Sequence, residues 1–440
     1  MHNKLKAIVL SGLSLFSVNY AKGDDAPIFL DAGASDPRVL GWMVGSPPTA
    51  DKVIRFEDGS FRHFPQSRWS FSHWRELVPT VNVSRGSGAI SVLPREERKD
   101  LDAVTFLPLG GTRPMTWDES LAANYTDGIV VLHKGRIVYE RYFGALTPDQ
   151  PHIAFSATKS LFGTIAAMLI TEGKLDSSAT VGHYIPELVA TGFGDATVAE
   201  VLDMTTALKY SEDYNDPNAD VTKWRLAYGG MPRPNGYSGP RSEYEYLTTI
   251  PKDGEHGVSF TYRSINTTVI GWLIARVSGM PAQRVLEERI WGRLGAEGDA
   301  YMQVDSIGTP AAASGFNARL RDLARFGEMI RRGGHYNGQQ IVPTEVISEI
   351  RRGGSREAFA KARYATLPGW SYHDQWWLSH NEHGAFMARG LHGQAIYIDP
   401  AAEMVIARFA SHPKPGNVSL DPTSLPAYEA IAKHLMARDK

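Results

Sequence analysis

Two hairpin patterns, far apart along the chain, constrain the fold most strongly. Residues Gly128–Tyr142 (GIVVLHKGRIVYERY) form two β-branched runs around a Lys134-Gly135 turn, and Gln394–Ala410 repeats the pattern around Asp399-Pro400. Helical patterns dominate between the hairpins, at Lys159–Gly173, Thr197–Met204, Thr267–Val277, Pro281–Leu294 and Asn317–Arg332. This order predicts an α/β (α+β) fold, in which an antiparallel sheet built from both ends is flanked by helices and carries an inserted helical lobe.

The 440 residues exceed the usual size of one domain, so we expect one large domain with an inserted lobe, or two domains. We assign residues 23–115 to a loop-rich N-terminal extension and residues 116–440 to the main domain, with the helical lobe at roughly 175–315. Asn317 is the expected cap of one helix, and Pro426–Ala437 is expected to form the last helix. A ligand would lie between the two lobes.

The first residues resemble an export signal. The basic segment MHNKLK is followed by the apolar run Ala7–Val18, which is too short to span a bilayer, and then by the small residue Ala21. This pattern predicts a cleaved signal peptide at residues 1–22 and a periplasmic or secreted protein; the alternative is an apolar tail. No later stretch is long and apolar enough for a transmembrane helix.

Charge and missing motifs exclude several classes of function. A net charge of −2 without a Lys/Arg block argues against nucleic acid or an anionic membrane as a partner. The absence of cysteine removes thiol nucleophiles, thiolate zinc sites and disulfides. There is no G-x-S-x-G elbow, no P-loop and no H-E-x-x-H. We interpret His380-Asn-Glu-His383 as a polar loop rather than a metal site, and we expect no cofactor.

The stretch FSATKS contains an S-x-x-K motif, Ser156 and Lys159, directly before the apolar run LFGTIAAMLI. That run predicts a buried helix, and a lysine at its head would lose affinity for its proton, as a base requires. The alternative is that Ser156 caps the helix while Lys159 reaches solvent, and these residues alone leave both interpretations open. A second S-x-x-K, Ser411–Lys414, contains one proline and precedes another, so it cannot form the necessary helical turn.

Two further segments could complete such a site. Tyr262 and Ser264 precede another apolar helix, from which they could reach a nucleophile, although a core tyrosine and a capping serine would give the same pattern. The segment Arg389–Gln394 (RGLHGQ) enters a hairpin strand, and we expect an edge strand there whose N–H groups could bind an oxyanion. The alternative is an ordinary glycine-rich strand entry.

The order of these motifs resembles the penicillin-recognising serine hydrolases, which include class C β-lactamases, D-Ala-D-Ala peptidases and family VIII carboxylesterases. Within this superfamily, the chain is similar to the 6-aminohexanoate-dimer (nylon-oligomer) hydrolases. The similarity begins near Arg68 and continues through HYIPEL (183–188), VLDM (201–204), YSEDYNDP (210–217), RDLARFG (321–327), DQWW (374–377) and HGQ (392–394).

The resemblance implies a β-lactamase/transpeptidase-like fold with the site in the cleft between sheet and helical lobe. Ser156 would be the nucleophile, and Lys159 and Tyr262 would share the work of the base. The backbone N–H groups of Ser156 and Leu391 would form the oxyanion hole. Tyr214, Ser264 and His392 would contact the substrate. No metal is needed in this chemistry.

On this interpretation, the substrate is a small ester or amide. Nylon-oligomer relatives carry an acid that meets the substrate ammonium at the position of Arg225, and an Asn at the position of Ala313. Because arginine repels an ammonium, we hypothesise a carboxylesterase of short acyl esters; the alternative for Arg225 is that it points to solvent. The alternatives are an amidase of 6-aminohexanoate oligomers or D-amino-acid peptides, and a non-catalytic peptidoglycan-binding module of the cell envelope. A homodimer is compatible with the sequence.

Overall fold

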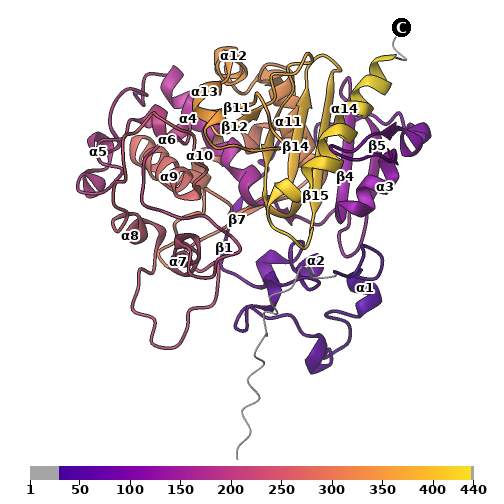
Figure 1. Ribbon diagram of the computed structural model, residues 1–440, viewed down its shortest axis with the longest axis horizontal. Helices are drawn as coiled ribbons and strands as arrows, with labels where there is room; N and C mark the ends of the chain where they lie inside the picture. Colours follow the sequence, from indigo (N-terminus) through magenta and orange to yellow (C-terminus); the bar gives the residue numbers. More distant parts are fainter. Residues whose placement is uncertain (1–28, 438–440) are drawn as a thin grey trace, which may run out of the picture.

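A computed structural model describes residues 29–437, so the predicted signal peptide lies outside the described residues. The largest sheet has seven antiparallel strands in the order β11-β12-β13-β14-β15-β4-β5. Their bounds are β4 Thr126–His133, β5 Arg136–Tyr142, β11 Ser371–His373, β12 Trp376–Leu378, β13 Phe386–Arg389, β14 Ala395–Asp399 and β15 Met404–Ala410. Pairing of β15 with β4 joins the two hairpins (Figure 1). The predicted α/β fold class, with an antiparallel sheet assembled from both ends, is confirmed.

Alternating side chains place the sheet between two helical layers. Ile129 and Val131 of β4 belong to the apolar cluster that contains α14 (Asp421–Ala437) and α3 (Trp117–Ala123). Val130 and Leu132 belong to the cluster on the opposite face, which contains α11 (Leu320–Arg331). Since successive side chains of a strand point to opposite faces, β4 is buried on both sides.

The remaining helices gather beside the sheet (Figure 1). They are α4 Thr158–Thr171, α5 Val181–Tyr184, α6 Val198–Leu202, α7 Asp220–Ala227, α8 Glu243–Leu247, α9 Ser264–Ser278, α10 Ala282–Arg289, α12 Thr344–Arg352 and α13 Arg356–Ala360. As expected, α4 is a buried helix, covered from Thr158 to Leu169. Gly163 of α4 has no room for a side chain, because a Cβ would lie 2.2 Å from the Asp374 carbonyl oxygen.

The N-terminal extension is joined to the main domain by a second sheet. This sheet has the order β1-β7-β8-β6, with β1 Thr80–Val83, β6 His152–Ile153, β7 Ala300–Gln303 and β8 Phe316–Ala318. The shorter elements are α1 Pro37–Leu40, α2 Ser67–Ser70, β2 Thr105–Phe106, β3 Met115–Thr116, β9 His335–Tyr336 and β10 Gln339–Gln340. Apolar residues between Ile54 and Val78 of the extension also pack with Ile153 and Phe155, at and just after β6.

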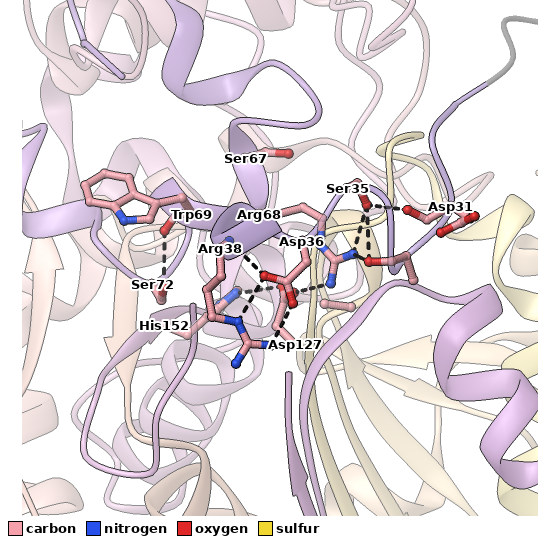
Figure 2. A network of polar contacts seen from close by, with 12 residues as sticks. Asp31, Ser35, Asp36, Arg38, Ser67, Arg68, Trp69, Ser72, Asp127 and His152 are labelled. Carbon is pink, nitrogen blue, oxygen red and sulfur yellow. Dashed lines mark hydrogen bonds and ion pairs between the residues drawn. The ribbon is translucent and has the colours of Figure 1, made fainter. Parts of the chain in front are cut away.

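A buried polar network also fixes the extension (Figure 2). Arg68 Nη2 lies 3.2 Å from Asp127 Oδ1 in β4, and Arg68 Nη1 donates to the Ala32 carbonyl at 2.6 Å. Asp127 Oδ2 lies 3.4 Å from Nε2 of His152 in β6, and these three side chains are almost fully buried. Removing one partner of a buried ion pair typically costs about 3–5 kcal/mol, so this network holds the extension firmly against the strands that lead to Ser156.

One helix boundary differs from the prediction. Asn317 does not cap a helix but lies in β8, paired with Tyr301 and Ile153, and α11 begins only at Leu320. Pairing with two strands from distant parts of the chain outweighs the local preference of Asn for a cap. No helix among residues 29–437 is both long enough and apolar enough to cross a bilayer.

Candidate active site

A cavity of about 180 Å³ opens beside the start of α4. Its walls are mainly aromatic and aliphatic, and include Tyr214, Tyr262, Tyr364, Trp377 and Leu391. Ser156 lines the same cavity. A small, largely apolar cavity with a few polar groups is the usual form of a site for a small molecule.

Ser156 and Lys159 meet within one turn of helix. Ser156 lies in a 3₁₀ turn, Phe155–Ala157, that leads into α4. Lys159 Nζ donates to Ser156 Oγ at 3.1 Å, to Ser264 Oγ at 3.0 Å and to the Ala313 carbonyl at 2.7 Å. Lys159 is only 1% exposed, and no side chain of the described residues caps α4. The geometry therefore excludes the alternative in which Ser156 caps the helix and Lys159 reaches solvent.

Burial changes the proton affinity of Lys159. Loss of hydration lowers the pKa of Lys159 to about 8, although the charges of Glu212 and Glu243 act in the opposite direction. An amine with this pKa is partly unprotonated near neutral pH. Lys159 can therefore accept a proton from the adjacent Ser156 hydroxyl.

The turn before Ser156 is conformationally strained. Phe155 has φ of +42°, which is unusual for a residue other than glycine. Its ring is held by Phe71 and Trp74 of the N-terminal extension, at centroid distances of 4.9 and 5.8 Å. Such strain is maintained only where the surroundings enforce it, so the extension helps to set the position of Ser156.

Tyr262 lies on the same cavity as Ser156 and is hydrogen-bonded to it. Burial and the charge of Glu212 raise the pKa of Tyr262 well above its usual value, while a hydrogen bond with Ser156 lowers it in part. The Tyr262 ring stacks on Trp377 at 5.6 Å, and Lys159 Nζ lies 5.2 Å from its centroid. Tyr262 is therefore a neutral phenol near pH 7, whereas Lys159 is the group whose proton is held less tightly than usual.

Sequence reasoning missed Glu212. Its carboxylate accepts hydrogen bonds from Ser264 Oγ at 2.6 Å, from the Ser264 N–H and from the Tyr214 hydroxyl. Ser264 thus bridges Glu212 and Lys159. The sequence did contain a signal, because Glu212 lies within YSEDYNDP, but only the fold brings this loop to the start of α9.

Replacing Glu212 by glutamine is expected to move the pH–rate profile of ester hydrolysis to lower pH by about one unit. The negative charge of Glu212 raises the pKa of both Lys159 and Tyr262, so its removal lowers both. The measurement is kcat/KM between pH 5 and 10. Asp213→Asn is the matched control, since Asp213 is an exposed neighbouring carboxylate, and it should leave the profile in place. An unchanged profile in Glu212→Gln would show that this charge does not reach the base.

The structure corrects the prediction of an edge strand at Arg389–Gln394. This segment connects β13 to β14, and both are interior strands of the sheet. Hydrogen bonds engage the N–H groups on either side of Leu391: Gly390 donates to the Gln394 carbonyl at 2.8 Å and His392 to the Pro415 carbonyl at 2.9 Å. Leu391 lines the cavity together with Ser156, so the N–H groups predicted to form the oxyanion hole belong to residues on the same cavity.

His392 lies behind this segment rather than on the cavity. Its Nδ1 is 2.7 Å from the His412 carbonyl, and its ring contacts Phe71 and Phe155 at centroid distances of 5.0 and 5.5 Å. Burial lowers the pKa of His392 to about 3, so the imidazole is neutral. His392 is positioned to support the turn that carries Leu391.

Arg225 lies against the cavity wall, and Ala313 lies beside Lys159. The Arg225 guanidinium lies 4.9 Å from the centroid of Tyr214, so it is half-buried against a residue of the cavity wall. Ala313 contributes its carbonyl to Lys159. The structure brings together Ser156, Lys159, Tyr262 and Ser264, with Tyr214 and Leu391 on the same cavity and Arg225 and His392 just outside it.

Two clusters of side chains contain residue types that commonly bind metals. His380 Nε2 contacts Ser371 Oγ and His383 Nδ1 contacts Asp399 Oδ2, each at 2.7 Å, so these two histidines have separate partners. Among residues 29–437, Asp203, His373 and Asp374 could converge on an ion. Burial alone would lower the pKa of His373, but the hydrogen bond with Asp203 and the nearby carboxylates raise it to about 9. We interpret this group as an ion-pair cluster, in which His373 contacts both Asp203 and Asp374.

A serine next to a buried lysine, at the head of a central helix packed beside an antiparallel sheet, defines a serine hydrolase of the penicillin-recognising class. Comparison with known proteins agrees, since the Beta-lactamase family model matches residues 120–426. The chain belongs to the β-lactamase family.

Relatives within the family are of several kinds. The 6-aminohexanoate-dimer hydrolase of Paenarthrobacter ureafaciens is 36% identical over 357 residues, which are 81% of this chain and 88% of that protein. A solved structure from Bacillus anthracis, proposed to be a 6-aminohexanoate-dimer hydrolase, has a TM-score of 0.80 and 32% identity, covering 89% of this chain and 99% of that one. A penicillin-binding protein homologue from Caulobacter crescentus shares the fold, with a TM-score of 0.52 and 17% identity over 71% and 96% of the two chains.

Proposed function

We propose that the protein is a carboxylesterase that forms an acyl-enzyme on Ser156 from esters with short acyl groups. The observation that carries this proposal is the 3.1 Å contact between Ser156 Oγ and the buried Lys159 Nζ, at a cavity of about 180 Å³. An apolar cavity of about 150 Å³ holds a molecule of the size of benzene. One short acyl group fills this space, and a long chain would extend beyond it.

In this mechanism Lys159, in its neutral form, takes the proton of Ser156 as Oγ attacks the ester carbonyl. The N–H groups of Ser156 and Leu391 bind the oxyanion of the tetrahedral intermediate. The Tyr262 hydroxyl then protonates the leaving alkoxide, and Lys159 returns a proton to Tyr262. Water attacks the acyl-enzyme by the same steps in reverse, which releases the carboxylic acid and restores Ser156.

The surroundings of Tyr214 support esters over 6-aminohexanoate amides. The acyl part of a 6-aminohexanoate oligomer carries an ammonium, and the Arg225 guanidinium lies 4.9 Å from the centroid of Tyr214. Placing two cations close together in a partly desolvated cleft is unfavourable. The similarity to 6-aminohexanoate-dimer hydrolases nevertheless makes amide hydrolysis the second function to test.

A substrate panel tests this proposal. We expect the purified protein to hydrolyse p-nitrophenyl acetate and butyrate with kcat/KM at least about 100-fold above that for p-nitrophenyl laurate, because the cavity has room for a short acyl group only. Hydrolysis of the 6-aminohexanoate dimer and of nitrocefin should be slower still. Efficient cleavage of the dimer would overturn the choice of ester over amide, and equal rates on butyrate and laurate would contradict the limit on acyl length.

A further inference from the structure

Two arginines beside the catalytic cleft have no carboxylate partner. Arg225 lies at the end of α7 with its guanidinium over Tyr214, and Arg62 comes from the N-terminal extension. In the part of the chain from 29 to 437, no carboxylate forms an ion pair with either, whereas Arg321 and Arg325 are both paired with acids. The charges of Arg225 and Arg62 repel each other, so an anion bound by both would relieve this repulsion.

Arg62 is connected to the segment that carries Ser156 through aromatic contacts. Its Nε donates to the Gly230 carbonyl at 2.6 Å, and its guanidinium lies 5.0 Å from the centroid of Trp74. Trp74 packs on Phe155, the residue before Ser156, at 5.8 Å. Burial lowers the pKa of Arg62 to about 10, which leaves it charged at neutral pH.

The two guanidinium groups act on the same region. The Gly230 carbonyl accepts from the Arg62 guanidinium, and the Gly230 N–H donates to the backbone carbonyl of Arg225 at 2.8 Å, so Gly230 contacts the guanidinium of one residue and the backbone of the other. Both charges also reach His392, next to Leu391, and each disfavours its protonation. The positive potential therefore lies beside the turn that carries Leu391.

Stabilisation of the end of α7 does not account for these two residues. Arg233 performs that task, since it donates to the Leu226 and Ala227 carbonyls at 2.9 and 2.8 Å. Arg62 hydrogen-bonds the Gly230 carbonyl through Nε and also the Tyr228 side chain, which leaves further N–H groups of a guanidinium whose five donors form a fork that matches a carboxylate. The nearest acid of the site, Glu212, is already engaged by Ser264 and Tyr214.

We propose that Arg62 and Arg225 bind a free carboxylate of the substrate, so that the preferred substrates are esters that also carry a carboxylate. This inference rests on the proposed esterase activity and adds the chemical class of the substrate. It also gives the N-terminal extension a direct part in substrate recognition, which a loop-rich segment in the sequence did not suggest.

Esters matched in size but not in charge test this proposal. The acyl series is monomethyl glutarate, methyl pentanoate and methyl 4-aminobutyrate, whose acyl chains all have five atoms; 4-carboxyphenyl butyrate against phenyl butyrate places the carboxylate on the leaving group instead. We expect a higher kcat/KM for the carboxylate ester than for its neutral partner in one of the two series, and the lowest value for the ammonium ester. Arg62→Gln and Arg225→Gln should each lower the carboxylate-to-neutral ratio about tenfold, as expected for loss of a charged hydrogen bond.

Two further variants make the result decisive. Arg225→Glu should invert the order of the carboxylate and ammonium esters. Arg233→Gln is the matched control, because it removes an arginine of the same segment that binds only backbone carbonyls, and it should keep the wild-type ratio. The proposal is overturned if wild-type protein shows no preference in either series, or if the arginine variants leave the ratios unchanged.

A binding measurement separates this proposal from the proposed activity. Calorimetric titration of glutarate into Ser156→Ala protein requires no catalysis. Binding that is lost in Arg62→Gln/Ser156→Ala would support the carboxylate site even if no ester were hydrolysed. Absence of binding together with efficient, charge-independent ester hydrolysis would retain the esterase and reject the carboxylate site.

Discussion

Replacing Ser156 by alanine is expected to lower kcat for p-nitrophenyl butyrate by on the order of 10⁴-fold or more, to near the rate without enzyme. Removal of the hydroxyl leaves no oxygen on which the acyl-enzyme can form. Fold and stability should be retained, because the change removes one oxygen atom from a side chain that lines a cavity. The measurements are initial rates and the mass of the intact protein after treatment with a fluorophosphonate.

Ser264 provides the matched control, since its Oγ lies 3.0 Å from Lys159 Nζ, about as close as that of Ser156. Ser264 is buried and donates its proton to Glu212, so it should not react. We expect the fluorophosphonate adduct in wild type and in Ser264→Ala but not in Ser156→Ala. An adduct on Ser156→Ala would show that another residue is the nucleophile. Wild-type protein without adduct or turnover would instead favour a non-catalytic peptidoglycan-binding module.

Local patterns were sufficient to predict the fold class and the identity of the central helix. The β-branched runs at Gly128–Tyr142 and Gln394–Ala410 form hairpins as expected, because period and turn chemistry are encoded in adjacent residues. The apolar run after FSATKS correctly predicted the buried helix α4, because a helix that is apolar around its whole circumference is normally covered on all sides. Family membership followed from the order of motifs and is confirmed by the match to residues 120–426.

Features that depend on contacts between distant segments could not be predicted in this way. Asn317 was assigned to a helix because its strand partners, Tyr301 and Ile153, are invisible to a local pattern. Glu212 reaches Ser264 only after a loop and a helix separated by more than 50 residues come together. Arg62 lies in a segment without periodicity, and its position depends on packing against Trp74 and on a carbonyl of a distant loop.

Replacing Lys159 by methionine is expected to lower kcat for ester hydrolysis by about 10³-fold or more. The same change is expected to raise the stability of the protein at pH 7. The unfolded chain holds the lysine proton with the ordinary pKa of 10.5, and the folded protein holds it with a pKa of about 8. Below pH 8 the lysine is charged in both states, and burying this charge on folding lowers the free energy of unfolding by about 3 kcal/mol. Methionine fills a similar volume without that charge, and apolar replacements of buried ionic groups are often stabilising by about 1–4 kcal/mol.

The pH dependence of this stability gain identifies its cause. Between pH 8 and 10.5 the unfolded wild-type chain binds more protons than the folded one, so the stability of the wild type should rise with pH and its deficit relative to Lys159→Met should shrink. Urea denaturation at pH 7, 8, 9 and 10 measures the deficit. Lys174→Met changes an exposed lysine just beyond α4, paired with Glu172 at 2.9 Å, and should alter neither activity nor the pH dependence. If Lys159→Met were less stable than wild type at every pH, Lys159 would be a structural cation held by its three acceptors, and another group would have to act as the base.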